Sequence, residues 1–287
     1  MLTCAPQHTT TAEEHWVTAR DGVKLYVRRY RPEGSRPARA VLWSHGMCEH
    51  GGRYEHVVAE FLARGWEVIL GDLRGHGLSG GLRADVDTFE TYLTDFDAIA
   101  QELSVDPQRT ALFGNSMGGL IMTRYAETRR DQWPALALAA PLFGVAVKVP
   151  WWKRRLGDIL MAFAPTTHLT AGLRESNMTS DPEFLAARHA DQFLQNSVSV
   201  RWYFAMQAAL KDVYEDAEKV TLPVLILQGL KDKTTDPEAP KYWMVQARSR
   251  DLELVEYSDA LHELLNDRGW QAVCGKLLDW LDQRVPG

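Results

Sequence analysis

One serine in this 287-residue sequence lies in a setting that could make it a nucleophile. A short apolar run ends in Gly114, Asn115, Ser116, Met117 and Gly118, and a stretch with helical spacing follows. At such a strand-to-helix junction, glycines on either side of the serine permit a tight turn that holds the hydroxyl above the sheet edge. The same pattern is compatible with a glycine-rich turn whose serine caps a helix. It therefore indicates nucleophilic chemistry only if a base and an acid follow.

His262 is the histidine best placed to act as the base. A serine hydroxyl is a weak nucleophile at neutral pH, so it needs an adjacent base, and in sites of this kind the partners follow in the chain order serine, acid, histidine. Among the nine histidines, only His262 lies beyond both the serine and a strand that could carry the acid. His168 and His189 also follow the serine, but they fall within a helical insertion. A surface histidine at the start of a helix is the alternative interpretation.

The acid is expected just beyond the apolar run at residues 224–227. Asp232 follows the end of this predicted strand, where a loop side chain can approach the sheet's carboxyl edge. Asp236 remains the alternative, although it directly precedes Pro237 and is typical of a residue that caps the next helix. With Asp232 as the acid, its carboxylate would orient the imidazole of His262, which would take the serine proton and later activate water.

Two backbone amides are expected to stabilise the negative charge that develops on a substrate carbonyl oxygen. The first belongs to Met117, the residue after the serine. The second belongs to Met47, in the loop that follows the apolar run at residues 40–43. We interpret His45 as a structural residue that holds this loop.

Strand-like runs alternate with helix-length segments from residue 38 onward, which is typical of an α/β fold with a mostly parallel central sheet flanked by helices. The predicted parallel strands cover residues 40–43, 66–70, 110–113, 135–140, 224–227 and 252–257. The predicted helices cover residues 53–64, 88–103, 118–128, 237–248 and 270–281. Two earlier strands, 15–19 and 24–30, flank the turn signal Asp21-Gly22 and are expected to form an antiparallel edge.

The alternation stops in one long segment, where aromatic and charged residues mix in a mainly helical pattern. We therefore expect a catalytic domain made of residues 1–142 and 221–287, with a helical cap inserted at residues 143–220. Trp151 and Trp152 open a basic stretch followed by spaced apolar residues, the composition of a helix that contacts a lipid substrate or a membrane–water boundary. Packing of these apolar residues against the catalytic domain is the alternative.

Composition argues against several other classes of protein. The formal net charge of −6 gives no general attraction to nucleic acid or anionic lipid. The apolar runs are far shorter than the roughly 20 residues of a membrane-spanning helix, and the first residues show no signal-peptide pattern. Cys4, Cys48 and Cys274 are widely spaced, which predicts neither a disulfide framework nor a zinc site. A reducing, cytoplasmic location is expected, with peripheral membrane contact left open.

Several segments together resemble the monoacylglycerol lipase and lysophospholipase group of α/β-hydrolases, whose members carry a serine aminopeptidase-like domain. The similarity covers most of the chain and rests on residues 45–54, 72–80, 116–119, 229–232 and 262–265. Asn115 is a departure, because the group usually has histidine before its nucleophile. The change does not alter the serine, histidine or aspartate, so hydrolysis is still expected, but the substrate preference of the group does not carry over with it.

The resemblance implies the α/β-hydrolase fold with a helical cap, and hydrolysis of carboxylic esters of lipid-like substrates through an acyl-enzyme on Ser116. It implies a small lipid or ester as the binding partner and no cofactor or metal. Three alternatives remain: a short-chain carboxylesterase, an aminopeptidase-like hydrolase, and a non-catalytic ligand receptor built on the same fold.

Overall fold

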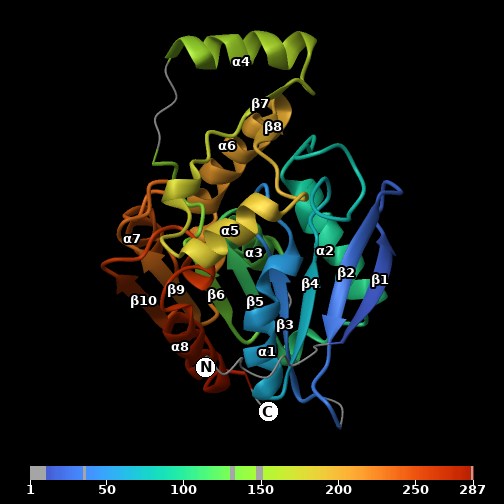
Figure 1. Cartoon of the computed structure of the whole chain (residues 1–287), viewed down its shortest axis with the longest axis vertical. Helices are drawn as coiled ribbons and strands as arrows, with labels where there is room; N and C mark the ends of the chain where they lie inside the picture. Colours follow the sequence, from blue (N-terminus) through green and yellow to red (C-terminus); the bar gives the residue numbers. More distant parts are fainter. Residues whose placement is uncertain (1–10, 35–36, 130–132, 147–150, 286) are drawn as a thin grey trace.

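One eight-stranded sheet forms the centre of the structure (Figure 1). The computed structural model describes residues 11–34, 37–129, 133–146, 151–285 and 287. The strand order is β1-β2-β4-β3-β5-β6-β9-β10. The bounds are β1 Ala12–Thr18, β2 Lys24–Tyr30, β3 Arg39–Ser44, β4 Trp66–Gly71, β5 Thr110–Asn115, β6 Leu136–Ala139, β9 Val224–Gly229 and β10 Leu252–Tyr257. Among the described strands of this sheet, β1 with β2 and β2 with β4 pair antiparallel and all the other pairs are parallel, so the predicted mostly parallel α/β sheet is confirmed.

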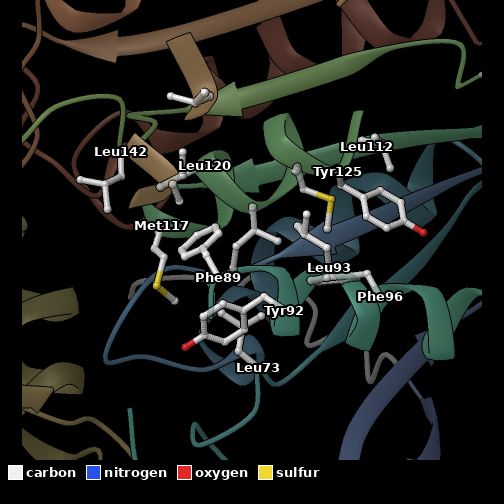
Figure 2. Packing of buried hydrophobic residues seen from close by; sticks show 14 of the residues in the cluster. Leu73, Phe89, Tyr92, Leu93, Phe96, Leu112, Met117, Leu120, Tyr125 and Leu142 are labelled. Atoms are coloured by element: carbon white, nitrogen blue, oxygen red, sulfur yellow. The ribbon is translucent and has the colours of Figure 1, made fainter. Parts of the chain in front are cut away.

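Helices cover both faces of this sheet, which is why strands such as β4 are buried along their whole length. The helix bounds are α1 Glu55–Ala63, α2 Glu90–Glu102, α3 Met117–Thr128, α7 Ala239–Met244 and α8 Trp270–Asp282. Apolar residues of α1 and α8 pack on one face, and those of α2 and α3 pack on the other. Figure 2 shows part of the second layer, where the rings of Phe96 from α2 and Tyr125 from α3 meet with their centroids 6.2 Å apart.

The chain between β6 and β9 forms a further group of elements. Their bounds are α4 Trp151–Phe163, β7 His168–Thr170, α5 Pro182–Ala190, β8 Ser197–Ser199 and α6 Val200–Glu215. Most of this segment is helical, but β7 and β8 form an antiparallel pair that the sequence pattern did not indicate. α6 packs against α3, and α4 lies beyond α6 at one end of the molecule (Figure 1).

One predicted helix, at residues 237–248, is wrong in length. It begins at Ala239 and ends at Met244, where the amide of Gln246 donates to the carbonyl oxygen of Trp243, three residues earlier, and tightens the chain into a turn. In the part of the chain that the structure describes, no helix has both the length and the apolar character needed to cross a bilayer.

Candidate active site

Ser116 lies at the turn between β5 and α3, in a backbone conformation with φ 54° and ψ −122°. Such a positive φ is strained for a residue with a side chain, and it is tolerated because the surrounding backbone packs closely. A Cβ atom on Gly114 would lie 2.2 Å from the carbonyl oxygen of Gly118, and one on Gly118 would lie 2.1 Å from that of Ser44. Both predicted elbow glycines are therefore sterically required.

The structure brings Ser116, His262 and Asp232 together at the carboxyl edge of the sheet. Nε2 of His262 lies 2.9 Å from Oγ of Ser116, and Nδ1 lies 2.7 Å from Oδ2 of Asp232. Asp232 follows β9 and His262 follows β10, so two adjacent parallel strands deliver the two partners. Because the carboxylate accepts from Nδ1–H, Nε2 is left free to accept the serine proton.

Asp232 is held by more than the histidine. Its carboxylate accepts hydrogen bonds from the amides of Thr234 and Thr235 and from the hydroxyl of Thr235, at 2.7, 3.0 and 2.7 Å. The sequence analysis did not single out Thr235, although a hydroxyl residue soon after the acid was a visible signal. Asp236 instead accepts the amide of Glu238, two residues further on, and no hydrogen bond joins it to the imidazole. The N-cap of α7 is Glu238, so the expectation that Asp236 caps this helix is wrong.

The electrostatics of this pair favour an ionised acid beside a basic imidazole. Burial disfavours the charged form of both groups, but the negative carboxylate stabilises the imidazolium and the imidazolium stabilises the carboxylate. The carboxylate of Asp232 outweighs desolvation and raises the pKa of His262 above its ordinary value. Likewise His262 and the Thr235 hydroxyl outweigh desolvation and lower the pKa of Asp232.

The two amides expected to bind an oxyanion belong to Met117, at the first turn of α3, and Met47. Neither amide donates a hydrogen bond to any residue that the structure describes, so both are available to a ligand. Nδ1 of His45 lies 2.7 Å from the carbonyl oxygen of Gly46, and the amide of Leu73 donates to Nε2 at 2.9 Å. His45 thus donates to the peptide unit that carries the Met47 amide and fixes its direction. Burial lowers the pKa of His45, which keeps this imidazole neutral.

A buried polar network that the sequence analysis missed lies behind this loop. It joins Glu49, Arg53, Tyr54, Asn115, Arg188 and Glu263 through hydrogen bonds and ion pairs. Asn115 lies at the end of the network nearest Ser116: its amide nitrogen donates to Glu49 and to the Tyr54 hydroxyl at 2.8 and 2.9 Å. Its oxygen accepts from the indole of Trp43 at 3.0 Å. The sequence signal that could have indicated this network was the pair Glu49 and Arg53, which lie inside the oxyanion-loop segment 45–54.

A cavity of about 890 Å³ opens above Ser116. The lining residues include His262 and Met47 at the reacting end, with Glu49, Arg188 and Glu263 close by in the network. Much of the remaining wall is apolar and includes Leu142, Val145, Leu156, Leu169, Leu173, Val198, Val200 and Trp202. Of the two tryptophans singled out from sequence, Trp152 lines the cavity, whereas Trp151 is 78% exposed and does not.

Comparison with known protein families places this chain in a known group. The family model described as serine aminopeptidase, S33, matches residues 35–269. The chain belongs to this family. With the α/β-hydrolase fold also shared by solved structures, this confirms the predicted recognition and makes the chain a hydrolase of the serine type.

Individual relatives are similar at low identity. Phospholipase YtpA of Bacillus subtilis is 25% identical over 82% of this chain and 92% of its own length. Human monoglyceride lipase is 28% identical over 94% of this chain and 90% of its own length. The crystal structure of Paleococcus ferrophilus monoacylglycerol lipase superposes with a TM-score of 0.82 at 27% identity, covering 91% and 99% of the two chains. A Dictyostelium discoideum protein named only as an uncharacterised abhydrolase is 27% identical over 92% of this chain, but the chain spans only 28% of its length.

Proposed function

We propose that this chain hydrolyses carboxylic esters of lipid-like substrates, above all monoacylglycerols, through an acyl-enzyme on Ser116. The observation that carries the proposal is that a hydrogen-bonded triad lies at one cavity with a largely apolar wall. A serine, histidine and aspartate in hydrogen-bond contact open into a cavity of about 890 Å³ whose far wall is mainly apolar. Such a wall suits an acyl chain, since each buried methylene contributes about 0.8 kcal/mol. The relatives named as monoglyceride lipases and phospholipase support the same substrate class.

The geometry supplies each step of an acyl transfer. Oγ of Ser116 attacks the ester carbonyl carbon while Nε2 of His262 takes the hydroxyl proton, and Asp232 stabilises the resulting imidazolium. The amides of Met47 and Met117 bind the oxyanion of the tetrahedral intermediate. When the intermediate collapses, His262 gives its proton to the leaving alcohol oxygen and the acyl group remains on Ser116. Water then attacks this acyl-enzyme and loses a proton to His262. When the second tetrahedral intermediate collapses, the bond to Oγ of Ser116 breaks, His262 returns the proton to Oγ, and the carboxylic acid is released.

We also propose that residues 143–220 act as a cap over residues 1–142 and 221–287. In support, α6 packs against α3, while residues from α4, the β7–β8 pair and α6 supply much of the cavity wall. α4 carries large apolar side chains that remain exposed, among them Trp151, Ile159 and Phe163 at 78%, 58% and 86%. Exposed cations, Arg154 and Arg155, lie on the same helix. This combination supports peripheral contact with a lipid surface.

The charge of the cavity argues against the aminopeptidase alternative. An enzyme that binds a peptide N-terminus needs an unneutralised carboxylate near the serine to receive the ammonium group. The carboxylates that line this cavity, Glu49 and Glu263, are already paired with Arg53 and Arg188. The apolar wall likewise favours a long acyl group over the short acyl groups of a simple carboxylesterase.

Hydrolysis of an ester panel tests the proposal. The panel contains monoacylglycerols of increasing acyl length, the matching lysophospholipids, acetyl esters and an aminoacyl anilide. We expect turnover to rise from acetyl to medium and long acyl groups, and to disappear in Ser116→Ala while the protein stays folded. Strongest turnover of acetyl esters with none of the long-chain glycerides would reject the lipase assignment. Failure of a phosphonate to label Ser116 in the folded protein would favour a ligand receptor.

A further inference from the structure

The cavity extends from the triad to the cap helix α4. Ser116 and His262 line it at the carboxyl edge of the sheet, and Leu156 and Gly157 line it from α4. Figure 1 shows α4 beyond α6, at the end of the molecule away from the sheet. A ligand that fills the cavity therefore has one end at Ser116 and the other end near α4.

Among the residues that the structure describes, every exposed charged side chain that lines this cavity is a cation. These residues are Arg154 on α4, Arg174 after β7 and Lys233 after β9, and we call them the mouth cations. Because they are exposed and yet line the cavity, they lie where it opens to solvent. The two carboxylates of the wall, Glu49 and Glu263, lie in the polar network beside the triad and pair with arginines there.

The mouth cations have no acidic partner in the part of the chain that the structure describes. Their side chains make neither an ion pair nor a hydrogen bond with a described residue. Arg188, the fourth cation of the wall, is paired with Glu263. The whole chain has a formal net charge of −6, so unpaired cations around one opening are a local departure from its surface. Such a group attracts anions to the opening.

An amphiphile with one negative charge matches this arrangement. The apolar wall can bury its tail, while the mouth cations hold its charged head in contact with water, which avoids the cost of burying a charge. The proposed hydrolysis produces such a molecule, because its acid product has a long alkyl tail and a carboxylate. The other product, the alcohol, carries no charge that these cations could recognise.

The opposite orientation, with the carboxylate at the triad, is less favourable. The carboxylate would then be buried near the negative charge of Asp232, which lies 2.7 Å from Nδ1 of His262. The amides of Met47 and Met117 offer it hydrogen bonds but no full positive charge. The cavity therefore favours the acid with its tail toward Ser116.

We propose that the free fatty acid binds in this cavity tail first, with its carboxylate on the mouth cations, and inhibits the enzyme by covering Ser116. This inference rests on the proposed ester hydrolysis and adds a feedback site for the anionic product of that reaction. No covalent bond changes on binding, and the acid competes with the ester for the same apolar wall.

Calorimetric titration with decanoate and with 1-decanol, both kept as monomers, tests the role of the charge. Arg154→Gln/Arg174→Gln/Lys233→Gln should weaken decanoate binding roughly 10-fold and leave 1-decanol binding unaltered. A matched triple variant removes the same formal charge from three exposed arginines outside the cavity: Arg20→Gln/Arg250→Gln/Arg268→Gln. It should bind both ligands as the unaltered chain does.

Two measurements on the unaltered chain need no variant. Raising the NaCl concentration from about 20 mM to about 0.5 M should weaken decanoate relative to 1-decanol, because salt screens exposed charges. Between pH 6 and pH 9 decanoate affinity should change less than about 2-fold, since arginine and lysine stay charged. A carboxylate held at the triad would instead lose the imidazolium of His262 over this range.

Steady-state kinetics connect binding to inhibition. Decanoate should raise KM for a neutral soluble ester and leave kcat unaltered, as expected when inhibitor and substrate occupy one cavity. In the mouth-cation variant, roughly 10-fold more decanoate should be needed for the same rise in KM.

Several results would overturn the inference. Equal weakening of decanoate in the two triple variants would show that only net charge matters, and affinity that falls with rising pH would place the carboxylate at the triad. Unaltered decanoate binding in the mouth-cation variant, with weaker binding to anionic vesicles, would assign these cations to a lipid surface. Decanoate binding without hydrolysis of any ester would refute the proposed function, whereas hydrolysis without charge-dependent inhibition would refute only the feedback site.

Discussion

The side-chain amide of Asn115 donates a 2.8 Å hydrogen bond to Oε1 of Glu49, which joins the residue before Ser116 to the loop that carries Met47. The same oxygen accepts the amide of Gly46 at 2.6 Å. Burial would favour the neutral acid, but the adjacent charge of Arg53 outweighs it and lowers the pKa of Glu49. The ionised carboxylate of Glu49 therefore holds both Asn115, next to the nucleophile, and Gly46 in the loop that carries Met47.

Asn115→Leu removes this connection while retaining a side chain of similar size. Glu49, the Tyr54 hydroxyl and the Trp43 indole each lose one partner, and a buried group left unsatisfied costs about 1–3 kcal/mol. We expect the free energy of unfolding to fall by about 2–4 kcal/mol and kcat to fall roughly 10-fold, since the Met47 amide loses part of its support. Denaturant unfolding and steady-state kinetics measure the two effects separately. Unchanged kcat in folded protein would show that Gly46 and Tyr54 position Glu49 without Asn115.

Asp232→Asn and Asp236→Asn form a matched pair that tests which acid serves the triad. Only Asp232 contacts His262, so its replacement should leave the fold intact and lower kcat by about 10³–10⁴-fold, because the amide no longer stabilises the imidazolium. Asp236→Asn keeps a side-chain oxygen that can accept the amide of Glu238, so kcat should change less than about 2-fold. Comparable losses in both variants would contradict the assignment of Asp232.

The pH dependence of kcat/KM should report His262. Only the neutral imidazole can take the serine proton, and its pKa lies above the ordinary 6.5. Activity on a neutral soluble ester should therefore rise with pH through a midpoint above about 6.5 and then level off. Asp232→Asn removes the main group that raises this pKa, so the residual activity should have its midpoint at lower pH. A midpoint that does not move would show that another group controls the profile.

The same shift makes a contribution to stability whose sign is fixed. The pKa of His262 is higher in the folded protein than in the unfolded chain, so its pairing with Asp232 stabilises the fold fully below about pH 6.5. This contribution is lost as pH rises through the folded-state pKa. Unfolding free energies of the unaltered chain and of His262→Gln should therefore differ more at pH 6 than at pH 9. An equal difference at both pH values would contradict the raised pKa.

The sequence predicted those parts of the site that depend on local backbone chemistry. The glycines around Ser116 and the positions of Asp232 and His262 after successive apolar runs were readable, because parallel strands deliver their ends to one edge. The catalytic roles of these residues and of Met47 stay predictions that the variants above test. The sheet was equally readable, since strands buried on both faces form continuous apolar runs.

What the sequence could not supply depends on contacts between distant segments. Glu49, Glu263 and Arg188 are far apart in the chain, and nothing in their spacing shows that they share one buried network. The β7–β8 pair was missed because three-residue strands carry almost no periodic signal. The end of α7 was misplaced because a turn at Trp243 competes with continuation of the helix.

Membrane contact through α4 can be separated from catalysis. Trp151 and Phe163 are 78% and 86% exposed, and each would bury a large apolar area in a lipid interface. The double variant Trp151→Ser/Phe163→Ser should bind vesicles at least ~10-fold more weakly, since burial of one such side chain contributes about 1.5–3 kcal/mol.

Tyr242→Ser, which removes a 64% exposed aromatic ring from α7, is the matched control and should bind normally. Co-sedimentation with neutral and with anionic vesicles gives the measurement, and the anionic vesicles should bind more protein because α4 carries Arg154 and Arg155. If the double variant and Tyr242→Ser bind equally well, α4 is not the contact.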